Sequence, residues 1–111
     1  MNRPSMSASG TALLRALFAR QPLDTHRILL SNICSTDWQS LTFDGERHQL
    51  GFVVRGPDAM ALAERWTDGL PDAELDVGRG RFVADIAVRG DLQRRDDDSV
   101  LVEIEALTLC D

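Results

Sequence analysis

The sequence of 111 residues contains no lysine and no tyrosine, and it has only two cysteines and two histidines. The absence of lysine excludes a Schiff base, a phosphate-loop lysine and a lysine nucleophile. The cysteines, Cys34 and Cys110, are too far apart for a CxxC or zinc-knuckle spacing. No apolar run approaches the roughly 18 to 20 residues that a membrane-spanning helix needs. We therefore expect a cytoplasmic chain with two reduced thiols, while a disulfide between Cys34 and the last strand stays an open alternative.

Basic residues are outnumbered by acidic ones. Eighteen acidic side chains against twelve arginines give a net charge of -6. Such a charge disfavours non-specific binding to nucleic-acid phosphates or to anionic lipid. We expect neither a nucleic acid nor a membrane as partner, and no motif indicates a cofactor.

Two segments have the apolar periodicity of amphipathic helices. Residues 1–8 are predicted to form a flexible tail, and residues 9–111 a single α+β domain. The first helix is expected to be capped by Ser9 and to end near Arg20. A second helix is expected to have Pro57 at its first position and to stop at a left-handed Gly69. Its apolar side comprises Ala59, Leu62, Ala63, Trp66 and Leu70.

The stretch between these helices is ambiguous at 24–34. Asp24 is a plausible helix cap, and Ile28, Leu29 and Ile33 share a helical face. This favours a second short helix, with a strand over 27–33 as the alternative.

From Trp38 onward the apolar residues alternate, as in strands with one buried face. Asp44-Gly45 is a dipeptide typical of a two-residue hairpin turn and joins two runs, the second of which contains Leu50, Phe52 and Val54. Two later strands, 81–89 and 99–109, are expected to pair. Their predicted core faces contain Phe82, Ala84, Ile86 and Val88, and Val100, Val102, Ile104 and Ala106.

A weak internal repeat relates residues 41–56 to 75–90, since both end in Val-Arg-Gly. It predicts two helix–hairpin units followed by a final strand. The Gly-Arg-Gly of 78–80 leads into a strand and not into a helix, so it indicates a hairpin turn and not a phosphate loop. The Arg-Gly-Asp of 89–91 is interpreted as a strand end.

These elements predict a two-layer α+β fold. About five antiparallel strands would have two or three helices on one face, in a ferredoxin-like or related split arrangement. In layout alone the chain is similar to small ferredoxin-like modules found in many bacterial assemblies and regulators.

Cys34 and His48 are candidates for nucleophilic chemistry or, with His26 and a carboxylate such as Glu46, for a metal site. No pair among them has a spacing that would preform a site, so loop or surface positions are the simpler interpretation. Cys34 is expected in a loop before Trp38. Trp38 is expected to begin a strand and to be a partly exposed candidate anchor for a partner or ligand.

Asp85, Glu103 and Glu105 are expected together on the sheet face opposite the core. Closely spaced carboxylates can serve as acid and base, but an ordinary solvated face or a charged subunit interface is the simpler interpretation.

Two function classes follow. The first is a non-enzymatic binding or assembly module that uses its sheet face or edge, with itself or another protein as partner. The second is a small enzyme or small-ligand-binding protein with a cleft that uses Cys34, His48 or the three carboxylates Asp85, Glu103 and Glu105. The sequence favours the first.

Overall fold

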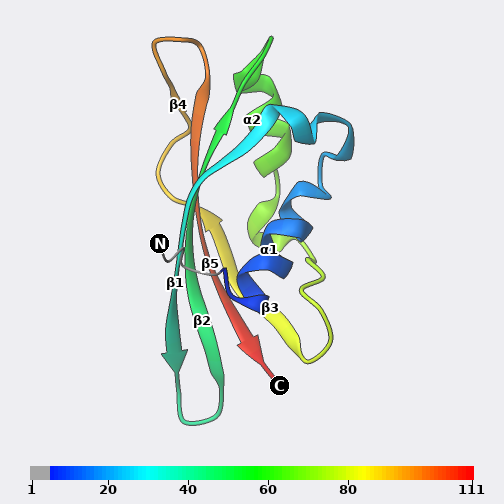
Figure 1. Cartoon of the computed structure of the whole chain (residues 1–111), viewed down its shortest axis with the longest axis vertical. Helices are drawn as coiled ribbons and strands as arrows, with labels where there is room; N and C mark the ends of the chain where they lie inside the picture. Colours follow the sequence, from blue (N-terminus) through cyan, green and yellow to red (C-terminus); the bar gives the residue numbers. More distant parts are fainter. Residues whose placement is uncertain (1–5) are drawn as a thin grey trace, which may run out of the picture.

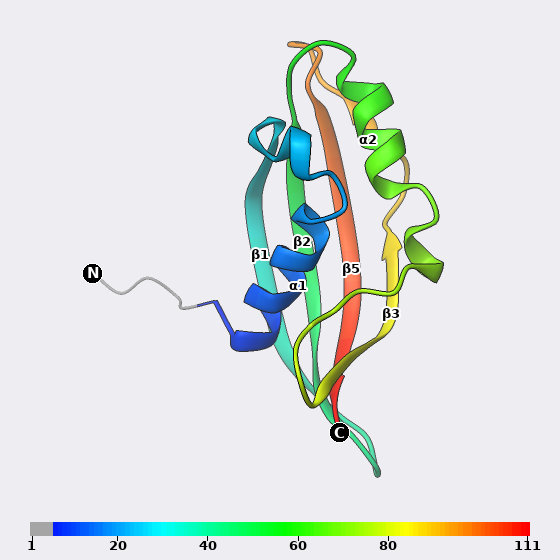
Figure 2. The same ribbon diagram turned by 90° about the vertical axis from the view of Figure 1, so that its right-hand side faces the viewer.

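A five-stranded antiparallel sheet with helices on one side forms the fold, as Figures 1 and 2 show. The computed structural model describes residues 6–111. The predicted α+β class is confirmed. The elements in chain order are helix α1 (Ala8–Phe18), 3₁₀ helix η1 (Pro22–Arg27), strands β1 (Ile28–Gln39) and β2 (Asp44–Val54), helix α2 (Ala59–Thr67), 3₁₀ helix η2 (Leu70–Asp72), and strands β3 (Arg81–Val88), β4 (Gln93–Arg94) and β5 (Val100–Cys110).

The strand order is β1-β2-β5-β3, and the short strand β4 also pairs with β5. The chain leaves β2, crosses through α2 and returns as β3, but β5 lies between these two strands. This is a split arrangement of the predicted kind, in which the last strand of the chain occupies the interior of the sheet. Among the described residues, β1 and β3 form the two edges.

The core lies between the helices and one face of the sheet, here called the inner face. Leu50, Phe52 and Val54 of β2 are buried there, as their alternation predicts. The Phe52 and Trp66 rings meet edge to face, with centroids 4.9 Å apart. The predicted apolar side of the second helix is also buried, with Ala59, Leu62, Ala63 and Trp66 in α2 and Leu70 at the start of η2.

The helix ends differ slightly from expectation. Ser7, and not Ser9, caps α1, because its Oγ accepts the Gly10 N–H at 3.0 Å. The loose tail expected over residues 1–8 therefore extends too far, because Ser7 and Ala8 already belong to the start of α1. Residues 1–5 lie outside the described part. Pro57 precedes the cap of α2, which is Asp58 in the left-handed region, at φ 53°. The expected left-handed Gly69 is confirmed, at φ 68°.

The helix favoured over 24–34 is wrong. Its first residues form η1, and Ile28 begins the twelve-residue strand β1, which contains both Cys34 and Trp38. The register with β2 shifts between Leu30 and Asn32, which marks a β-bulge. The bulge interrupts the alternation of side chains, so the apolar residues before and after it imitate helical spacing.

The predicted β1–β2 hairpin is present, but its turn is not at Asp44-Gly45. The turn is formed by residues 40–43, where the Ser40 N–H donates to the Phe43 carbonyl at 2.9 Å. Asp44 and Gly45 belong to β2. Gly45 is needed there for space, because a Cβ would lie 2.1 Å from the Thr108 carbonyl oxygen of β5.

The second hairpin that the repeat predicts is absent. Gly78 and Gly80 do adopt positive φ in a turn closed by the Arg81 N–H and the Gly78 carbonyl. The segment that enters this turn, residues 73–77, has no strand structure. β3 ends at Val88, and Gly90 has a φ of 65°, in agreement with the interpretation of Arg-Gly-Asp as a strand end.

The predicted core face of β3 is also partly wrong. A bulge shifts the register with β5 between Val83 and Asp85. Ile86 and Val88 face the core, but before the bulge it is Val83 that packs there. Phe82 therefore lies on the other face of the sheet, with 36% of its surface exposed.

Trp66 links the two α-helices, because its indole Nε1–H donates to the Leu17 carbonyl at 2.8 Å inside the core. We predict that Trp66→Phe lowers the free energy of unfolding by about 1–3 kcal/mol, since this carbonyl loses its partner and the ring leaves a gap. Urea denaturation measures the change. Leu41→Ala at the fully exposed hairpin tip is the control and should change stability by less than about 0.5 kcal/mol. Equal effects of the two substitutions would contradict the prediction.

Candidate functional site

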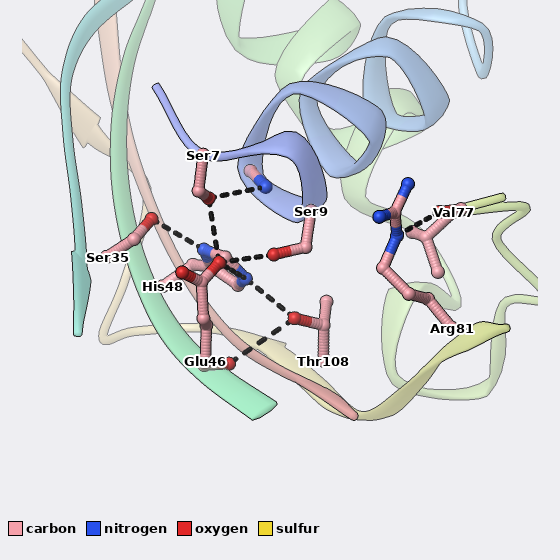
Figure 3. Close-up of polar contacts among 9 residues, drawn as sticks. Ser7, Ser9, Ser35, Glu46, His48, Val77, Arg81 and Thr108 are labelled. Carbon is pink, nitrogen blue, oxygen red and sulfur yellow. Dashed lines mark hydrogen bonds and ion pairs between the residues drawn. The ribbon is translucent and has the colours of Figure 1, made fainter. Parts of the chain in front are cut away.

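A polar network lies on the inner face of the sheet, beneath the first turn of α1 (Figure 3). Glu46 and His48 are two residues apart in β2 and so point to the same side. Across the strands, Ser35 of β1 pairs with His48 and Thr108 of β5 pairs with Glu46. His48 is completely buried, whereas Glu46 keeps 23% of its side chain exposed.

Burial favours the neutral imidazole of His48, and its hydrogen bonds fit the tautomer that is protonated at Nε2. Its Nδ1 lies 2.7 Å from Ser35 Oγ and its Nε2 lies 2.8 Å from Thr108 Oγ1. The Thr108 hydroxyl donates to the Glu46 carbonyl at 3.5 Å, so its oxygen is free to accept the Nε2–H of His48. Ser35 then donates to Nδ1. Burial lowers the pKa of His48, and the opposing charge of Glu46, 4.0 Å from Nε2, does not compensate.

The Glu46 carboxylate joins the sheet to α1. Its Oε1 accepts hydrogen bonds from Ser7 Oγ at 2.7 Å and from Ser9 Oγ. Burial alone would raise the pKa of Glu46, but the Ser9 and Ser7 hydrogen bonds, together with the Arg81 charge, hold it below the usual value for glutamate. A carboxylate at the N-terminus of a helix is also favoured by the helix dipole.

This network fits a structural role better than a catalytic one. The adjoining cavity of about 290 Å³ reaches Glu46 and Thr108 but is not lined by His48 or Ser35. Each ring nitrogen of His48 is already hydrogen-bonded within the fold. The network therefore holds α1 in place on the sheet and leaves His48 without access to a substrate.

Cys34 and His48 are not brought together. They lie one register step apart on neighbouring strands, since Cys34 pairs with Gln49, and this places their side chains on opposite faces of the sheet. Cys34 is exposed on the outer face and His26 lies in η1. Within residues 6–111, no three His, Cys, Asp or Glu side chains are grouped so that they could hold a metal ion.

The three candidate carboxylates lie on the outer face, which no described helix covers. Asp85 pairs with Leu107 across β3 and β5, and Glu103 pairs with Gly51 across β5 and β2. Glu105 lies between two arginines, with Arg47 at 3.3 Å and Arg89 at 3.6 Å. The centre of the outer face is thus a charged surface in which at least Glu105 is balanced by arginine.

One end of the outer face is apolar. Trp38, Gly45, Leu109 and Phe82 are consecutive register partners across β1, β2, β5 and β3. The Phe82 ring meets Phe43 edge to face, with centroids 5.8 Å apart. Leu109 covers Gly45, since its Cδ2 would lie 2.7 Å from a Cβ there. We call Trp38, Phe43, Phe82 and Leu109 the aromatic row.

The three aromatic side chains of the row are at least partly exposed to solvent, whereas Leu109 is buried between them. Phe43 and Phe82 keep 38% and 36% of their surfaces accessible, and Trp38 is half-buried. Sequence reasoning identified Trp38 but assigned Phe82 to the core, because the β3 bulge was not visible in the pattern. An aromatic cluster of this kind on an uncovered sheet face is typical of a protein-binding surface.

The buried network was also missed, although one signal for it exists. Glu46 and His48 continue the inner-face alternation of Leu50, Phe52 and Val54, so two polar groups stand at the end of an apolar face. Polar groups in such positions require partners. Those partners come from residues 13 to 60 positions away, which no local pattern can identify.

A separate hollow of about 580 Å³ lies between α1 and the segment leading to β3. Arg15, Arg20 and Arg81 are among its lining residues. Arg20 is engaged within the fold, because it donates to the carbonyls of Trp66 and Asp68 at 2.9 and 2.7 Å. None of the six residues predicted from the sequence lines this hollow: Cys34, Trp38, His48, Asp85, Glu103 and Glu105.

Comparison with known proteins shows that the chain shares its fold with a solved structure. No protein-family model matches the sequence, and no curated protein matches it either. Among solved structures, the chain is similar to one described as "Virion of native gene transfer agent (GTA) particle". The similarity covers 96% of this chain and 97% of that one, with a TM-score of 0.60 and 19% sequence identity. At this identity the likeness shows the fold alone. No helix in the described part, 6–111, has the length and apolarity to span a membrane.

The buried network makes stability depend on pH. Because the folded-state pKa of His48 is lowered, the unfolded chain binds the proton first as the pH falls. The stability that neutral His48 provides is complete above the ordinary histidine pKa of about 6.5 and is lost progressively below it. Glu46, whose pKa is also lowered, adds a second loss at more acidic pH. Urea unfolding at a series of pH values should show both.

The control for this prediction is the other histidine. His48→Gln, which keeps hydrogen-bonding capacity toward Ser35 and Thr108, should flatten the decline just below about pH 6.5. His26→Gln in η1 should leave it unchanged. A decline that survives His48→Gln would show that another group causes it.

Proposed function

We propose that the chain is a non-enzymatic structural subunit that assembles with other protein subunits in a virion-like particle. The aromatic row on the uncovered outer face carries this proposal. A monomer that functions alone would be expected to cover or avoid such a cluster, because exposed apolar clusters favour association. Aromatic side chains contribute much of the binding energy in protein interfaces.

The whole-length likeness in fold supports the particle assignment. The similar chain comes from a gene transfer agent particle, and nearly all of both chains is aligned. Because nearly the whole length of both chains is aligned, we infer that they share the same arrangement of strands and helices. We infer a comparable assembly role, with other copies of this chain or other proteins as partners.

Charge and thiol chemistry refine the proposal. A net charge of -6 favours protein partners over nucleic acid or anionic lipid. Cys34 and Cys110 are both exposed free thiols, which fits a subunit made in the reducing cytoplasm.

The enzyme or ligand-binding alternative has less support. Cys34 and His48 lie on opposite faces, His48 has no access to solvent, and Glu105 is paired with two arginines. The hollow beside α1 offers space for a small ligand, but the residues that suggested chemistry are elsewhere. No observation favours this second function specifically.

We predict that the purified chain self-associates with increasing concentration and that Phe82→Asp weakens this association at least tenfold. A charge in the aromatic row must be desolvated at the interface, which costs roughly 1.4 kcal/mol or more. Sedimentation analysis over a wide concentration range measures the effect.

Leu23→Asp provides the matched control, because Leu23 is 88% exposed in η1, which precedes the end of β1 opposite to Trp38. It should associate like the parent chain. A parent chain that stays monomeric at every concentration, or equal weakening by both substitutions, would refute the proposal.

A further inference from the structure

The sheet has two long edges that pair with nothing in the described part of the chain. β1 is one edge, with twelve residues, and β3 is the other, with eight (Figure 2). Edge strands expose unpaired backbone groups, and proteins commonly protect them with lysine, proline or charge. β1 contains no proline and no basic residue, and its one charged residue is Asp37. Its main irregularity is the bulge near residue 31.

The two edges are compatible in direction. Each neighbouring pair in the order β1-β2-β5-β3 is antiparallel, so β1 and β3 run in opposite directions. When a second copy is placed beside the first in the same orientation, its β3 therefore runs antiparallel to β1. That arrangement continues the hydrogen-bonded sheet with no reversal of either copy.

We propose that β1 of one copy pairs with β3 of the next, so that the sheet continues from subunit to subunit. This inference rests on the assembly function proposed above and names the partner, a second copy of this chain. Because the two edges differ, the contact is heterologous, and it extends beyond a dimer into a ring or a filament.

The side-chain rows support the pairing. Trp38 and Phe82 are the two ends of one row across the sheet. In a continued sheet Trp38 lies next to Phe82 of the next copy, which extends the aromatic row across the boundary. On the inner face Arg81 belongs to the same row as Gln39, so it lies diagonally from Asp37 of the neighbouring copy. This places opposite charges at the same junction.

A cysteine cross-link tests the contact directly. Cys34 and Ala87 are the ends of another row, through Gln49 and Glu105. Within one chain they are separated by three strand spacings, roughly 14 Å, which no disulfide can span. Between copies the proposed pairing makes them neighbours. A disulfide between Cys34 and a cysteine at position 87 must therefore join two chains.

The experiment uses Ala87→Cys in the full chain with Cys110→Ser. Under mild oxidation we expect a ladder of disulfide-linked multimers on non-reducing gels, in large excess over the same chain without Ala87→Cys. Ala61→Cys replaces Ala87→Cys in the matched control, since it offers an exposed thiol on α2, outside both edge strands, and it should give only background dimer. Removing Cys34 by Cys34→Ser should abolish the ladder.

Other outcomes would overturn the pairing. A product that stops at the dimer would indicate a symmetric contact, and a ladder from Asp85→Cys but not from Ala87→Cys would show a different register. If sedimentation shows self-association but Ala87→Cys gives no ladder, the edge contact is wrong while the assembly function stands. If the parent chain is monomeric throughout, the assembly function itself fails.

Discussion

The pairing of β5 between β2 and β3 is the constraint on which the rest of the structure depends. β5 is the last strand of the chain, yet it pairs with β2 over eleven consecutive positions without a register shift. This ladder fixes which residues of β2 face the helices and which face outward. It also aligns β3, which within residues 6–111 pairs with β5 alone. Both the buried network and the aromatic row consist of residues that this alignment brings together.

The two faces of the sheet solve the burial of polar groups in different ways. On the inner face, Glu46 and His48 are enclosed, and hydroxyls from α1, β1 and β5 satisfy them with short hydrogen bonds. Buried polar groups without such partners would be strongly destabilising. On the outer face the charged side chains remain partly exposed to solvent and form ion pairs at the surface, as Arg47 and Arg89 do with Glu105. The inner network therefore positions a helix, while the outer charges remain available to a partner.

The sequence predicted the parts of this structure that depend on local pattern. The α+β class, the buried side of α2 and the inner face of β2 all follow from regular spacing of apolar residues. The errors occur where a strand is irregular. The bulges in β1 and β3 each displace the alternation by one residue, and this concealed a strand at 28–39 and moved Phe82 to the wrong face. The sequence predicts a turn at Gly45 because glycine is flexible. It does not reveal that the Thr108 backbone of β5 lies too close for a side chain at this position.

The bulge in β3 reverses the faces that the alternation in the sequence predicts. It also places Phe82 on the outer face, which is the face proposed for assembly. Without a register shift, Phe82 would have the same orientation as Ile86 and would belong to the core. The shift turns Phe82 outward beside Leu109 and Phe43, at the edge of the sheet and not at its centre. Trp38 reaches the opposite edge of the same row because β1 is long enough to pair with β2 as far as Gln39. Under the proposed pairing of β1 with β3 of a second copy, this row, which ends in an aromatic side chain at both edges, would continue into the neighbouring subunit.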